Sequence, residues 1–409
     1  TSGNIQYFIE DSGNALMQKY TGSDTVYVIP SEIDGHLLTS IGGNAFNENN
    51  IIESVTIPAS VTTIEGGFSG CTSLKTITIP SSVVSIGVRT FMGDSALETI
   101  FLSPRLVTIG AEAFRDCTAL TSVVIPEGVT SLGSELFANC SSLESVVLPA
   151  SVSVWGEGIF DGCFSLSQVV LGSELTEIPA RMFRGCESLN DASVLDGVIA
   201  IGEEAFADCG FVSLTLSEGI TTIGEWAFAS SRELTEIQMP VSLETIGSHA
   251  FESCISLETI MIPAGVSALG DYPFFGCWSL TDIEVASGNP YYSSVEGILY
   301  SKDMNVLVKY PQSHQDRSYS LPETVVTIAD GALSYVRLDD GFSLANVTTI
   351  GNEAFLWANK ADEVLYIPAS VTTMGFHAFG TNQTLLLEVE ALEKPSGWDE
   401  EWVFDPMDS

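Results

Sequence analysis

Short stretches of alternating apolar and polar residues recur along the chain, and the segment LKTITIPSSVVSIGVRTF (Leu74–Phe91) contains the complete pattern. Leu74, Ile77 and Ile79 have the L-x-x-I-x-I spacing of a strand with one inward face. Pro80 then ends the strand, because proline has no N–H for a hydrogen-bonded ladder. The pattern predicts a short strand that buries one side only.

The second half of the same segment predicts another short strand and a turn. Val83 and Ile86 form a second inward-facing stretch, and Gly87 follows it. We interpret Gly87 as a turn residue that needs a positive φ. From there to Phe91 we expect a short helical or irregular turn that buries the phenylalanine ring.

The phenylalanines repeat this segment at a fixed period. Eleven units follow one another from Phe46 to Phe274 at spacings of 22 or 23 residues, and Leu333, Phe355 and Phe379 continue the series. Such a period is typical of leucine-rich-repeat solenoids, in which each unit buries too little alone and is covered by its neighbours. We predict a single curved, right-handed repeat solenoid of leucine-rich-repeat type with a long parallel β-sheet and roughly fourteen coils.

Two regions interrupt the repeat. Residues 286–320 contain GILY, a polar turn and VLVKYP, which favours a β-hairpin, although a long surface loop is the alternative. The N-terminal segment Ile5–Gly22 has a similar pattern, and Trp398 and Trp402 follow the last coil. The predicted parts are an N-terminal capping β-hairpin (1–28), the solenoid (29–285), an inserted β-hairpin (286–320), the continued solenoid (321–390) and a C-terminal cap (391–409).

Eight cysteines share one position of the repeat, three residues after a phenylalanine. No local pair with zinc-ligand spacing is present. Parallel side chains in stacked coils keep their Cβ atoms about 4.8 Å apart, which is too far for a disulfide. Asp94 and Ser231 occupy the same position in other coils. We therefore expect a ladder of reduced, buried cysteines: Cys71, Cys117, Cys140, Cys163, Cys186, Cys209, Cys254 and Cys277.

The chain is strongly acidic, with 53 acidic and 14 basic residues and a net charge of −39. Nucleic-acid binding relies on a basic surface, so we exclude it. An anionic membrane surface would repel the chain, and no apolar run is long enough for a transmembrane helix, so we expect no direct membrane insertion. The chain starts at Thr1 with no signal-like segment, which leaves secretion open.

No catalytic or metal-binding motif is present. The sequence lacks H-E-x-x-H, G-x-S-x-G and the Walker pattern, and its four histidines are scattered. Acidic pairs such as Glu203–Glu204 and Asp339–Asp340 fit a solvated face in so acidic a chain. We expect no catalytic residue, no metal ligand and no cofactor, and we predict that the protein is not an enzyme.

The segment IGAEAFRDCTALTSVVIPEGVTSLG (Ile109–Gly133) resembles the BspA-like, or Treponema-type, leucine-rich repeat. The resemblance extends over nearly the whole chain, because Phe, Cys, Leu, Ile and Pro all recur in register. It implies a bacterial secreted or cell-surface protein, and some relatives act in adhesion or bind host extracellular matrix. It brings no catalytic residue and no fixed ligand-binding residue.

The residue between the two inward positions of each strand faces outward, and it is apolar in four consecutive coils. This favours a ligand-binding surface, although β-branched residues also suit any sheet. We expect a non-catalytic, adhesin-like binding protein with a protein or glycan ligand; the alternative is a structural spacer without its own ligand. The oligomeric state stays open. The candidate binding stripe on the expected concave face is Thr78, Phe101, Val124, Val147 and Val170.

Overall fold

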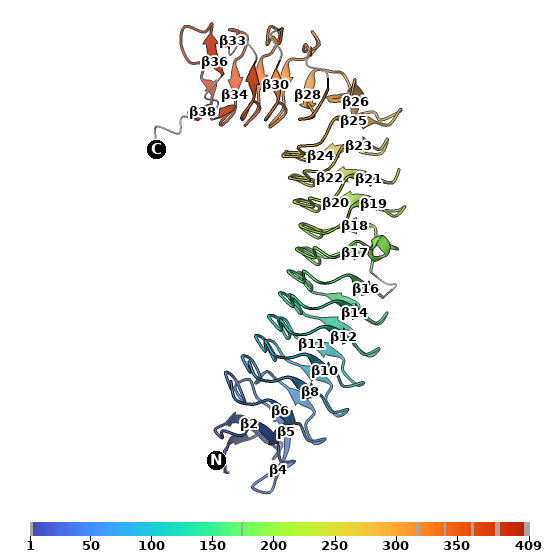
Figure 1. The fold of residues 1–409 in the computed structure, drawn as a ribbon, viewed down its shortest axis with the longest axis vertical. Helices are drawn as coiled ribbons and strands as arrows, with labels where there is room; N and C mark the ends of the chain where they lie inside the picture. Colours follow the sequence, from blue (N-terminus) through green and yellow to red (C-terminus); the bar gives the residue numbers. More distant parts are fainter. Residues whose placement is uncertain are drawn as a thin grey trace. The chain divides into compact units, whose positions relative to one another are not determined.

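The computed structural model describes residues 3–172, 175–315, 319–338, 341–360, 364–380 and 385–404, without the side chains of Ala192 and Phe404. It is a parallel β-solenoid, as predicted (Figure 1). It has about 16 turns, which is more than the fourteen expected. The only helix in the described part of the chain is the short 3-10 helix η1 (Ala192–Leu195). The chain forms two compact units, Thr1–Gly210 and Phe211–Ser409, and each is described by itself.

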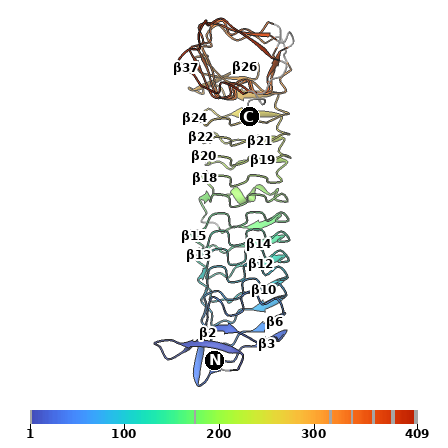
Figure 2. The same cartoon turned by 90° about the vertical axis from the view of Figure 1, so that its left-hand side faces the viewer.

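The first unit consists of two columns of short parallel strands, which Figure 2 shows side by side. The first column contains β3 (Val26–Val28), β6 (Ser54–Thr56), β8 (Thr76–Thr78), β10 (Thr99–Phe101), β12 (Ser122–Val124), β14 (Ser145–Val147) and β16 (Gln168–Val170). The second contains β5 (His36–Ile41), β7 (Thr63–Ile64), β9 (Ser85–Ile86), β11 (Thr108–Ile109), β13 (Ser131–Leu132), β15 (Val154–Trp155), β17 (Glu177–Ile178) and β18 (Ala200–Ile201).

An antiparallel hairpin opens the first unit. Strands β1 (Ile5–Ile9) and β2 (Ala15–Tyr20) pair antiparallel, and the short β4 (Glu32–Ile33) pairs with β5. Strand β2 also pairs in parallel with β5. The hairpin therefore joins the parallel ladder. A count of solenoid turns from the phenylalanine spacing does not include the turn that the hairpin forms.

The second unit repeats the two-column arrangement. Its first strands are β19 (Ser213–Thr215), β21 (Glu236–Gln238), β23 (Thr259–Ile262) and β25 (Asp282–Val285), beside β20 (Thr222–Ile223), β22 (Thr245–Ile246) and β24 (Ala268–Leu269). Its later strands are β29 (Thr327–Ile328), β30 (Arg337–Leu338), β31 (Thr349–Ile350), β32 (Asn359–Lys360), β33 (Val364–Ile367), β34 (Thr373–Met374), β35 (Phe379–Gly380), β36 (Leu386–Val389), β37 (Gly397–Trp398) and β38 (Val403–Phe404).

The predicted hairpin of residues 286–320 is present. Strands β27 (Ile298–Ser301) and β28 (Val306–Lys309) pair antiparallel, and β26 (Tyr292–Val295) adds a third antiparallel strand on β27. Strand β28 also pairs in parallel with β29. The insert thus continues the ladder in the same way as the N-terminal hairpin.

The phenylalanines form a continuous stack in the core. In the first unit, consecutive rings from Phe46 to Phe206 lie with their centroids 5.1 to 5.8 Å apart and nearly parallel. In the second unit, Phe228, Phe251 and Phe274 stack at 5.5 and 5.9 Å. These rings are buried, as the repeat predicted. The stack is an apolar contact that recurs between successive coils.

The turn glycines serve close packing rather than a positive φ, so that interpretation of Gly87 was wrong. A Cβ atom added at Gly110 would lie 2.6 Å from the carbonyl carbon of Gly87 in the preceding coil, closer than any real contact. The positive φ occurs two residues later, at Arg89 (56°) and Glu112 (55°). Non-glycine residues thus occupy the left-handed region, where the coil bends around its buried phenylalanine.

The eight cysteines are free and buried. Each thiol donates a hydrogen bond to the carbonyl of the phenylalanine one coil earlier, as Cys117 Sγ does to Phe91 O at 3.1 Å and Cys140 Sγ to Phe114 O at 3.1 Å. Burial raises the pKa of both thiols. The thiol row therefore links neighbouring coils as a set of neutral donors.

Asp94 is the acidic member of the cysteine row. It is fully buried, and its Oδ1 atom accepts the N–H of Cys71 at 2.8 Å. Its Oδ2 atom has no hydrogen-bond partner in the described part of the chain. Burial raises the pKa of the Asp94 carboxyl well above its usual range.

Candidate functional site

The structure brings the five stripe residues together on consecutive strands of the first unit. Thr78 is the register partner of Phe101, and Val147 is the register partner of both Val124 and Val170. Strands β10 and β12 lie next to each other. The stripe is therefore a continuous row that crosses β8, β10, β12, β14 and β16.

The apolar members of this stripe face solvent. Their exposed fractions are 58% for Phe101, 68% for Val124, 43% for Val147 and 57% for Val170. The other outward position of the same strands carries small or neutral side chains, namely Thr99, Ser122, Ser145 and Gln168. An apolar row with an uncharged border is typical of the centre of a protein interface.

Shallow cavities lie at both ends of the stripe. One has a volume of about 270 Å³ and is lined by Thr56, Thr78 and Pro80, among others. The other has about 490 Å³ and lies between Val170 and Ser193. The repeat spacing of 23 residues places the next outward position after Val170 at Ser193, but η1 forms there instead of a strand.

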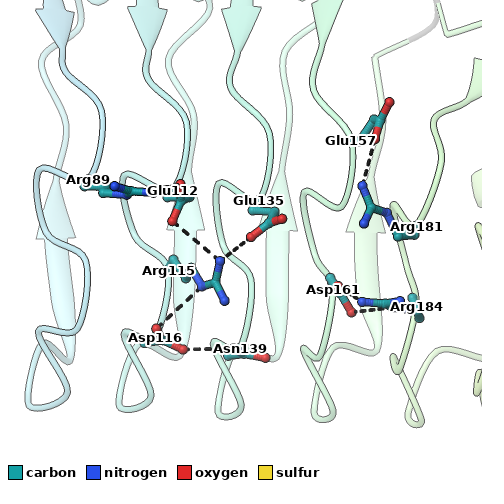
Figure 3. A network of polar contacts seen from close by, with 10 residues as sticks. All are labelled: Arg89, Glu112, Arg115, Asp116, Glu135, Asn139, Glu157, Asp161, Arg181 and Arg184. Carbon is teal, nitrogen blue, oxygen red and sulfur yellow. Dashed lines mark hydrogen bonds and ion pairs between the residues drawn. The ribbon is translucent and has the colours of Figure 1, made fainter.

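A second row of side chains, on the turns of the first unit, is charged and internally paired (Figure 3). Arg115 bonds Glu112 and Glu135, and Arg184 bonds Asp161 and Glu204. The Arg89 guanidinium beside Glu112 lowers the pKa of that carboxyl, and the hydrogen bonds that Arg184 donates to Asp161 raise the pKa of Arg184. These guanidinium groups are thus engaged with carboxylates of neighbouring coils.

The described residues show no arrangement suited to metal binding or membrane crossing. No three His, Cys, Asp or Glu side chains gather in a metal-binding group. No helix in the described ranges is long and apolar enough to span a bilayer. Of the acidic pairs in the sequence, Glu204 bonds Arg184 and Glu203 is exposed, whereas Asp339–Asp340 lies outside the described residues.

Sequence reasoning missed an aromatic row on the turns of the second unit. Trp226 and His249 stack with ring centroids 4.0 Å apart, and His249 and Tyr272 stack at 5.2 Å. Each residue comes two positions after a turn glycine and has a positive φ. The signal was an aromatic ring at that position in three consecutive coils.

The stacked coils, the one-sided strands and the phenylalanine row define the leucine-rich-repeat class of solenoid. A family model described as BspA type leucine rich repeat region, in six copies, matches residues 39–167, 156–281 and 312–392. The chain belongs to this family. No curated protein matches it.

Several solved structures are similar to this chain, and the first of them shows the same fold. A leucine-rich repeat protein from Bacteroides ovatus is 22% identical, with a TM-score of 0.63, and the match covers 96% of this chain and 99% of that one. A leucine rich cell surface protein from Faecalibacterium prausnitzii is 19% identical over 96% and 94% of the two chains, with a TM-score of 0.42. The Treponema pallidum leucine rich repeat protein is 26% identical and covers 56% of this chain and 100% of its own, with a TM-score of 0.42.

Proposed function

We propose that this chain is a secreted or cell-surface, non-catalytic binding protein, and that the stripe Thr78, Phe101, Val124, Val147 and Val170 contacts its ligand. The observation that carries the proposal is the exposure of four apolar side chains on consecutive strands. Solvent alone would favour polar residues there. Membership of a repeat family of bacterial surface-type proteins agrees with a binding or scaffold role.

The energetics allow moderate affinity. Full burial of a large apolar side chain contributes about 1.5–3 kcal/mol, so four of them supply several kcal/mol. Loss of rigid-body freedom and desolvation offset much of this gain. The net charge of −39 favours neutral or basic ligands, and a host extracellular-matrix protein or a glycan fits these conditions.

The test is a binding screen of the purified chain against extracellular-matrix proteins and glycans, followed by the double variant Phe101→Asp with Val147→Asp. The variant should abolish binding of any ligand found and keep the circular dichroism of the solenoid. The matched control is Val212→Asp with Val241→Asp, which charges two exposed valines of the second unit. Binding that survives the stripe variant intact would show that the stripe is only a sheet surface and that the ligand binds elsewhere, for instance at the hairpin of residues 291–311. A screen that finds no ligand would favour the structural spacer.

A further inference from the structure

The ladder of the second strand column is interrupted between β15 and β17. In the regular coils a turn glycine donates its N–H to the preceding coil, as Gly156 does to Leu132 O at 2.9 Å. Pro179 holds the glycine position in the next coil and has no N–H to donate. In the described part of the chain, no backbone hydrogen bond joins β17 to β15.

Trp155 occupies a core position of the coil on one side of this break. Neighbouring coils place buried isoleucine or leucine there, as at Ile109, Leu132 and Ile178. Trp155 is instead partly exposed. The two departures from the repeat, Trp155 and Pro179, thus lie on the two sides of one interruption.

A groove of about 660 Å³ opens at the interruption. It is a local opening, because β14 and β16 remain paired in the other column and Gly158 N donates to Ala180 O at 2.9 Å in the turn. Its lining combines the indole with three hydroxyl side chains and three carboxylates: Trp155, Ser151, Ser153, Thr176, Glu157, Glu177 and Glu203.

The groove carries negative charge that the protein does not compensate. Glu157 bonds Arg181 at 2.8 Å. Glu177 and Glu203 are exposed and form no ion pair within the described residues. Carboxylates beside an indole attract a cation through charge and through the aromatic ring, whereas a neutral sugar would leave the negative charge uncompensated.

The groove also presents free backbone groups. The missing ladder bonds would join the N–H groups of Thr176 and Glu177 to the carbonyls of Ser153 and Trp155. These groups have no backbone partner in the described ranges. Unpaired edge groups of this kind can bond the main chain of an extended peptide. The cationic side chain and the main chain of one ligand can therefore be held together.

We propose that this groove binds an arginine or lysine side chain of an extended peptide segment. Trp155 contacts the cationic side chain, Glu177 and Glu203 neutralise its charge, and the strand edges bond the peptide backbone. The site is separate from the stripe on the first strand column and does not rest on the function proposed for it.

The test uses the full chain and two libraries of short peptides, one with arginine or lysine fixed at the centre and one with glutamine there. We expect the first library alone to be enriched on the wild-type protein. The double variant Trp155→Leu with Pro179→Gly restores the repeat residues and should close the groove, which removes the enrichment. The variant Glu177→Gln with Glu203→Gln should keep the groove and weaken the selected peptides about tenfold.

The controls separate this site from general charge attraction. Glu98→Gln with Glu144→Gln removes two exposed charges elsewhere in the first unit and should leave binding unchanged, as should the stripe variant Phe101→Asp with Val147→Asp. Equal enrichment of both libraries, enrichment that persists in the closed variant, or binding of a neutral oligosaccharide in place of the peptides would overturn the proposal.

Discussion

The two units have the same kind of core, a stack of phenylalanine rings, and differ in the residues that their turns present. Two residues after the turn position, where φ is positive, the first unit carries charged side chains, among them Glu112, Glu135 and Arg181. The second unit carries the rings of Trp226, His249 and Tyr272 in three consecutive coils. Each unit has its own phenylalanine stack in the core.

The difference shows that the backbone of the turn fixes the distance between equivalent side chains of neighbouring coils but does not fix the type of residue. Side chains at the same position of neighbouring coils lie within reach of one another, since the coils are stacked strands about 4.8 Å apart. Charged residues at that spacing form ion pairs such as Arg89–Glu112 at 2.8 Å. Aromatic residues at the same spacing stack instead. The first kind of contact is screened by salt, and the second is not.

The largest expected effect concerns the phenylalanine stack that each unit has in its core. Phe137→Ala in the first unit and Phe251→Ala in the second should each cost about 3–5 kcal/mol, because both rings are buried between two stacked neighbours. Urea denaturation of the two variants measures the cost. A difference of more than a few kcal/mol between them would show that the cores are not equivalent.

The next effect compares the polar members of the cysteine row, Asp94 in the first unit and Ser231 in the second. The pKa of Asp94 is higher in the folded than in the unfolded state, where it is about 4. The contribution of Asp94 to the stability of the fold therefore falls as pH rises from about 4 through the folded-state pKa. Asp94→Asn removes the charge and keeps the acceptor for Cys71, and it should stabilise the chain by about 1–3 kcal/mol at neutral pH. The gain should vanish below about pH 4. Thermal melts across this range test it, with Ser231→Ala as the comparison expected to lack the pH slope.

Removal of one ring from the aromatic row should have a smaller effect. Tyr272 stacks on His249, contacts the edge of Phe275 and remains partly exposed. Tyr272→Ala should therefore cost about 2 kcal/mol, less than a buried phenylalanine. The cost should be the same in low and high salt, and a marked salt dependence in denaturation would contradict an apolar origin.

The smallest effect is expected in the charged row. Arg184→Met removes two ion pairs, but the Arg184 side chain is 39% exposed and water screens its charge. The loss should be at most about 1 kcal/mol in low salt. It should shrink further in about 1 M NaCl. A loss that salt leaves unchanged would point to packing by the arginine stem.

The repeat, the inward strand positions and the buried Phe and Cys rows could be predicted from the sequence. They follow from the spacing of 22 or 23 residues and from the apolar character of the recurring positions. The role of Gly110 could not be predicted, because the clash that it avoids involves the backbone of another coil. The repeat spacing would place a strand at Ser193, but η1 forms there instead. The groove could have been suspected from IP in place of IG at 178–179 and from Trp155 in a row of Ile and Leu, but its volume depends on how the coils separate.

The reactivity of the buried thiols reports local opening of the solenoid. Only a thiolate reacts readily with an alkylating reagent, and burial disfavours that form, as in Cys277, whose thiol pKa is raised to about 12. A cysteine becomes reactive when its coil detaches from the phenylalanine carbonyl behind it. Timed alkylation followed by mass spectrometry would thus give an alkylation rate for each cysteine. These rates would show in which coils of each unit local unfolding begins.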